Sequence, residues 1–126
     1  MSREFLSALL MLLLIAGSAL NIMAADRLCD KMLGCIDRAE AAAEEENWAG
    51  AEDNAQRALE LWLGAKAYTH IFIRHSEIDI CTDAFYELEE AILSKNTDEI
   101  KPVFAKLRYH INSIADMEKP TPGNIL

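Results

Sequence analysis

The sequence predicts an all-α protein in which an N-terminal transmembrane helix precedes a four-helix domain of two stacked αα-hairpins. Three observations predict this fold class. Residues 5–25 contain no charged side chain, the apolar residues beyond Asp26 recur at helical spacing, and the second half of the chain repeats the apolar pattern of the first. We therefore divide the chain into a membrane segment at 1–25, an acidic helical domain at 26–118 and an extended tail at 119–126.

The apolar segment from Phe5 to Ala25 is long enough to cross the ~30 Å hydrocarbon core of a bilayer as a helix. A cleaved signal peptide is the alternative, because Gly17-Ser18-Ala19 and Met23-Ala24-Ala25 offer possible cleavage sites. Neither site is a clean Ala-x-Ala and the apolar run continues through both, so we expect a retained signal-anchor. Lipidation of Cys35 is disfavoured, because four charged residues separate this cysteine from the apolar run.

Two signals for the orientation of the anchor conflict. Arg27, Lys31 and Arg38 outnumber Arg3 and the amino terminus, which favours a cytoplasmic domain under the positive-inside rule. A four-residue tail before the apolar run is instead typical of a signal-anchor, which leaves this tail in the cytoplasm. We expect the second signal to prevail, so that the domain lies outside the cytoplasmic membrane in a single-pass protein.

The net charge of −9 belongs to the domain beyond the anchor. Nucleic acids and anionic lipid headgroups are bound largely through Lys and Arg, so this acidity excludes both as principal ligands. The number of cysteines is odd, and Cys29 and Cys35 lie too far apart on one helix for a disulfide. A bond from either to Cys81 is geometrically open, but we expect buried thiols instead.

Apolar spacing and capping signals predict four helices in the domain. The first continues from the anchor to about residue 46, and the others run at about 48–73, 76–94 and 97–117. Ser76 with Asp79, and Asn96 with Glu99, form capping-box-like pairs at the starts of the third and fourth helices. Pro102 is expected to kink the first turns of the fourth helix or to delay it.

The two halves of the domain superpose at an offset of 49 residues. Small residues of the first hairpin then fall on large residues of the second, which predicts two hairpins that pack against each other. The stretch from Asn47 through Ala58 also resembles, locally and weakly, the turn and second helix of a tetratricopeptide unit. The superposed pairs include Met32 with Cys81, Ile36 with Phe85, Ala55 with Phe104, Trp62 with Ile111 and Ala65 with Ile114.

The whole layout resembles a bacterial family, domain of unknown function 4363. The features that carry the resemblance are the N-terminal anchor, the acidic turn from Glu44 to Trp48, Trp62, the string from His75 to Asp79, and the ending from Asn124 to Leu126. The resemblance implies a membrane-associated helical protein of Gram-positive-type bacteria with no assigned activity.

The best candidates for a metal site are His75, Glu77 and Asp79, because an imidazole and two carboxylates within five residues could bind a divalent ion. Both carboxylates are expected in the first turn of a helix, where they stabilise the positive end of its dipole, so we assign no metal site. The acidic run from Glu44 to Glu46 lacks the further ligands and the glycine of a calcium loop. We therefore expect it to be a solvated corner.

No pattern of a nucleophile beside a base and no glycine-rich phosphate loop is present, so we expect no catalytic residue, no cofactor and no enzyme. Two hypotheses for function follow. The first is a membrane-tethered interaction module that binds another membrane or envelope protein. The second is a sensor domain for a cation or a small molecule at the cell envelope.

Overall fold

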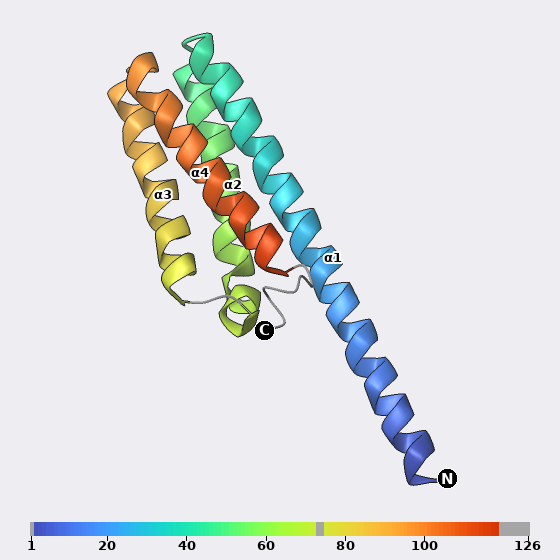
Figure 1. Cartoon of the computed structure of the whole chain (residues 1–126). Coiled ribbons are helices and arrows are strands. Elements are labelled where there is room, and N and C mark those ends of the chain that lie inside the picture. Colours follow the sequence, from blue (N-terminus) through green and yellow to red (C-terminus); the bar gives the residue numbers. More distant parts are fainter. Residues whose placement is uncertain (1, 73–74, 119–126) are drawn as a thin grey trace.

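The computed structural model describes residues 2–72 and 75–118, and at 21–22, 66–72, 75 and 117–118 it describes the backbone alone. All the regular elements in these ranges are helices, so the predicted all-α class is confirmed (Figure 1). The predicted tail at 119–126 lies outside the described residues. The four helices are α1 (Arg3–Glu44), α2 (Trp48–Phe72), α3 (His75–Ser94) and α4 (Thr97–Glu118).

The helix α1 contains both the apolar segment and the first helix of the domain. Its 42 residues give a length of about 63 Å at 1.5 Å per residue. The helix begins after Ser2, whose Oγ accepts a hydrogen bond from the backbone N–H of Phe5 at 3.2 Å. Its N-terminal part extends alone (Figure 1). Among the side chains of α1 that the structure describes, Cys29 is the first that is buried. The apolar segment therefore enters the bundle without a break.

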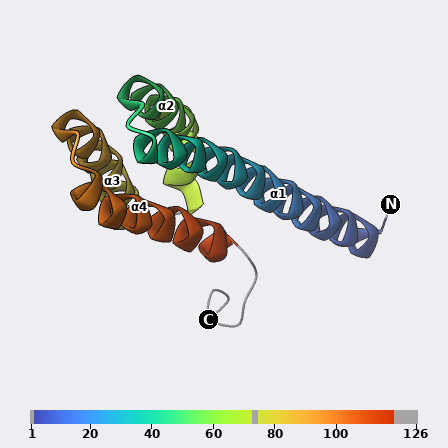
Figure 2. The ribbon, with the colours of Figure 1, turned by 90° about the horizontal axis from the view of Figure 1, so that it is seen from above.

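The C-terminal half of α1 forms a bundle with the three shorter helices. The helices α1 and α3 each pack against both α2 and α4, so the hairpins α1–α2 and α3–α4 lie side by side (Figure 2). Both turns within the hairpins lie at the end of the bundle far from the N-terminus (Figure 1). Because α4 packs back on α1, the ring of helices is closed, and the likeness to a tetratricopeptide unit stays confined to the local sequence.

The core repeats at the 49-residue offset that the sequence predicts. Buried positions of α1 and α2 recur as buried positions of α3 and α4, and small side chains in one hairpin match large ones in the other. Pairing of this kind fills the space between helices at the density of protein interiors. Matched buried pairs are Ala39 with Leu88, Ala43 with Ile92, Ala51 with Ile100, Ala55 with Phe104 and Ala58 with Leu107.

The turns within the two hairpins share one backbone geometry. Glu46 and Lys95, which are 49 residues apart, both take a left-handed conformation, with φ of 59° and 56°. An asparagine follows each of them and caps the next helix. The Oδ1 atoms of Asn47 and Asn96 accept hydrogen bonds from the backbone N–H three residues on, at 3.1 and 3.4 Å. The predicted cap at Asn96 is therefore confirmed.

Some predicted helix starts and ends differ from those observed. The helix α3 begins at His75, so Ser76 lies within its first turn and does not precede it as a cap. The helix α1 ends at Glu44, two residues early, because the turn at Glu46 takes a left-handed backbone. The helix α4 begins at Thr97 and contains Pro102, so of the two expected effects of this proline, a kink or a delay, the delay does not occur.

Arg108 of α4 joins the second hairpin to α1 through two carboxylates. Its Nε donates to Asp37 Oδ1 at 3.0 Å and its Nη2 donates to Glu40 Oε1 at 2.8 Å. The hydrogen bond with Glu40 is the main cause that raises the pKa of Arg108, so this guanidinium stays charged. Its side chain is 28% exposed, whereas both members of the Arg57–Asp53 pair on α2 are more than 60% exposed.

We expect Arg108→Ala to lower the free energy of unfolding by about 1–2 kcal/mol, because it leaves the partly buried Glu40 without its partner. The matched variant Arg57→Ala removes an exposed pair within one helix and is expected to cost less than about 0.5 kcal/mol. Chemical unfolding of the full chain in detergent micelles, followed by circular dichroism, measures both. Equal losses would show that the interhelical pair adds no stability.

Candidate functional site

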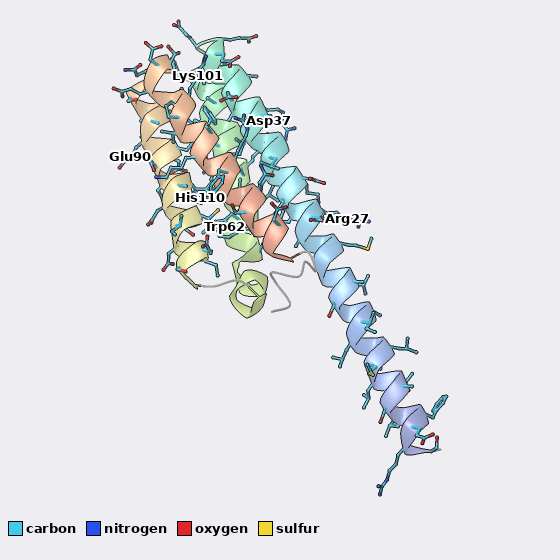
Figure 3. All side chains as sticks on the ribbon, in the orientation of Figure 1. Arg27, Asp37, Trp62, Glu90, Lys101 and His110 are labelled. Carbon is cyan, nitrogen blue, oxygen red and sulfur yellow. The ribbon has the colours of Figure 1, made fainter. Side chains whose placement is uncertain are left out.

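The apolar part of α1 is a candidate membrane span by its length and composition. Its large side chains point outward with no other helix beside them (Figure 3), and none of its most apolar stretch is buried. Leu12, Leu14 and Leu20 are each more than 60% exposed. Side chains this apolar are more stable in contact with lipid than with water, because each methylene group removed from water contributes about 0.8 kcal/mol of favourable free energy.

The predicted metal candidates lie at the start of α3. Glu77 is half-buried in the first turn, as expected, but Asp79 is exposed and lies in the second turn, because the helix begins one residue earlier than predicted. The side chain of His75 is outside the described residues. Among the side chains that the structure describes, no three of His, Cys, Asp or Glu are grouped so as to hold a metal ion. Our expectation that His75, Glu77 and Asp79 form no metal site therefore stays untested, because the side chain of His75 is not described.

A cleft of about 250 Å³ opens at the end of the bundle far from the N-terminus, between the last turns of α1 and the first turns of α4. Two residues of the predicted acidic corner, Glu44 and Glu46, line the cleft together with Asp98 and Lys101 of α4 (Figure 3 labels Lys101). The carboxylates outnumber the ammonium group, so the cleft favours cationic groups. Sequence reasoning missed this cleft because its two walls are more than fifty residues apart in the chain.

His110 is the one histidine whose side chain the structure describes. Its ring lies edge-on to Tyr109, with 5.5 Å between the ring centroids. The side chain lies half-buried on α4. The contact with Tyr109 indicates that His110 packs on the surface of the bundle.

The cysteines are buried as thiols, as the sequence predicts. Cys29 Sγ lies 3.8 Å from the backbone oxygen of Ile111, and Arg38 Nη2 donates to Cys35 Sγ at 3.3 Å. Burial is the main cause that raises the pKa of the Cys81 thiol from 9.0 to about 12, with smaller contributions from Cys29 and Glu77. Cys81 is therefore a core residue and not a reactive nucleophile.

We expect Cys81 to resist maleimide at pH 8 in the folded protein, because the thiolate would be on the order of one part in ten thousand and the sulfur is fully buried. Mass spectrometry of labelled peptides measures its modification. An exposed reference, Leu93→Cys, should react fully under the same conditions, and Cys81 should react only in denaturant. Equal rates for both thiols in the folded protein would contradict this burial.

Together these features define a class of protein: a closed, acidic four-helix bundle carried by a long apolar helix. Residues 21–125 match the model of a family described as "Domain of unknown function (DUF4363)", and the chain belongs to this family. The resemblance inferred from the sequence is thereby confirmed over the bundle, while residues 1–20 lie outside the matched region. Searches of curated proteins and of solved structures gave no match.

Proposed function

We propose that this protein is a membrane-tethered interaction module whose bundle lies outside the cytoplasmic membrane and binds another membrane or envelope protein. The observation that carries the proposal is the dual use of α1, whose N-terminal part is apolar and uncovered and whose C-terminal part is a core element of the bundle. Because the helix is continuous, a partner that binds the bundle is held at a fixed height above the bilayer. The proposal includes no catalytic activity.

Apolar side chains on the outer face of α3 support a protein partner. Tyr86 is 49% exposed and Leu93 is 67% exposed. They are seven residues apart, so they lie on one side of the helix. Aromatic and aliphatic side chains on an otherwise acidic surface are the contacts that protein interfaces bury at their centres. We therefore place the partner on this face of α3.

Site-specific photocrosslinking in membranes tests the proposal. A photoreactive phenylalanine analogue at Tyr86 or at Leu93 should yield one crosslinked species of constant size, identified by mass spectrometry as a membrane or envelope protein. The control position is Arg57, whose side chain is 63% exposed on α2, and it should give no such species. The proposal fails if Tyr86 and Leu93 give no crosslink while the protein remains in the membrane fraction.

A second candidate function is the sensing of a cation or a cationic small molecule in the acidic cleft between α1 and α4. The cleft of about 250 Å³, with Glu44, Glu46 and Asp98 in its lining, favours this candidate. Calorimetry with calcium, magnesium and a polyamine should then show binding that Asp98→Asn weakens. A melting temperature that none of these ligands raises would exclude the candidate.

A further inference from the structure

The end of α2 reaches the level of the apolar segment. The two helices are antiparallel around the turn between Glu44 and Trp48, and both rise 1.5 Å per residue. Equal steps along both helices from this turn pair Phe72, the last residue of α2, with about Leu20 of α1. In Figure 1 the last turn of α2 is drawn lower, on the side of the N-terminus, than the end of α4.

The position of α2 relative to a bilayer follows from this register together with the proposed function, in which α1 spans the membrane. If residues 5–25 lie within the bilayer, the level of Leu20 is below its surface. The turn of α2 that ends at Phe72 cannot then lie wholly in bulk water. It must enter the headgroup layer, which adds several ångströms to each side of the hydrocarbon core.

The sequence of this part of α2 fits such a layer. No acidic residue occurs between Glu60 and Glu77, although the whole chain carries a net charge of −9. The last two turns of α2 instead combine basic, aromatic and aliphatic residues, which is the composition of membrane-interface segments. These residues are Lys66, Tyr68, His70, Ile71 and Phe72.

We infer that residues 66–72 of α2 form a second membrane contact, seated in the lipid headgroup layer beside the anchor. The net charge of the whole chain does not reveal that residues 61–76 lack carboxylates, because the acidic residues are concentrated in other parts of the chain. The acidic cleft, with Glu44, Glu46 and Asp98, lies at the opposite end of the bundle. Repulsion from an anionic surface would therefore push that end away from the bilayer and keep residues 66–72 toward it.

Fluorescence quenching in vesicles tests this contact. The full chain is reconstituted in phosphatidylcholine vesicles containing phosphatidylglycerol, with an environment-sensitive dye on a single introduced cysteine at Phe72, Leu13 or Leu93. Lipids that carry a nitroxide near the headgroup should quench the dye at Phe72. Without the nitroxide, the emission of this dye should lie at shorter wavelength than in water, because the headgroup layer is less polar. Leu93, exposed one residue before the end of α3 and so at the far end of the bundle, is the control that should stay unquenched.

The dye at Leu13 separates the two proposals. Quenching at Leu13 by a nitroxide deep in the acyl chains, with water-like and unquenched emission at Phe72, would overturn the second contact and leave the anchor intact. An unquenched dye at both Leu13 and Phe72 would refute the membrane tether itself. Labelling of the unsubstituted chain, whose cysteines are buried, sets the background.

Discussion

Replacing Trp62 by alanine is expected to lower the free energy of unfolding by about 3–5 kcal/mol, the largest loss that we expect from one truncation in the bundle. The indole is fully buried, and its ring centroid lies 6.3 Å from that of Phe85 on α3. Its Nε1 donates to Thr82 Oγ1 at 2.9 Å. The truncation would remove packing across the α2–α3 interface, and the loss is a large share of the 5–15 kcal/mol typical of a domain.

Two comparisons isolate the cause of this loss. Trp62→Phe keeps most of the aromatic volume and removes the indole donor, and Thr82 keeps its own bond to the backbone oxygen of Ile78. We therefore expect Trp62→Phe to cost much less than Trp62→Ala, on the order of 1–2 kcal/mol. Leu63→Ala, at the neighbouring exposed position, should cost about 0.5 kcal/mol or less. Urea unfolding of the full chain in micelles measures all three, and similar losses for Trp62→Ala and Leu63→Ala would contradict this role.

The helices and the core could be predicted because local signals and tertiary packing agree. The spacing of apolar residues marked the buried faces, and an asparagine marked the start of α4. The 49-residue offset also predicts equivalent core positions from the sequence alone. Ala65 is the exception, since it is only half-buried while its counterpart Ile114 is buried. It lies beyond Trp62, toward the end of the bundle nearest the N-terminus.

The candidate sites could not be predicted to the same degree, because they depend on contacts between distant parts of the chain. Arg108 bonds to Asp37 and Glu40 across 71 and 68 residues, and nothing in local spacing selects those partners. The acidic cleft could not be predicted for the same reason, because Asp98 and Lys101 form one of its walls and lie far along the chain from the other. The level of Phe72 against the apolar segment likewise required both the length of α2 and its direction along α1.

The second large effect concerns the membrane span. We expect the double variant Leu12→Arg and Leu13→Arg to move the protein from the carbonate-resistant membrane fraction to the soluble or aggregated fractions. Each arginine at the centre of a span opposes insertion by about 2.5–3.5 kcal/mol, and each Leu, Ile or Phe favours it by about 0.3–0.6 kcal/mol. Residues 5–25 hold ten such apolar side chains, so two central charges offset their whole contribution.

The matched control places a charge on an equally exposed leucine of the bundle. Leu13 is 61% exposed and Leu93 is 67% exposed, so Leu93→Arg makes the same substitution of arginine for leucine at a similar degree of exposure. It should leave fractionation unchanged, because Leu93 lies at the end of the bundle far from the apolar segment. Intact-mass measurement of the unsubstituted membrane-bound protein separates an anchor from a cleaved leader. A mature product that begins near Asp26, or a double variant that stays resistant to carbonate, would contradict a span at residues 5–25.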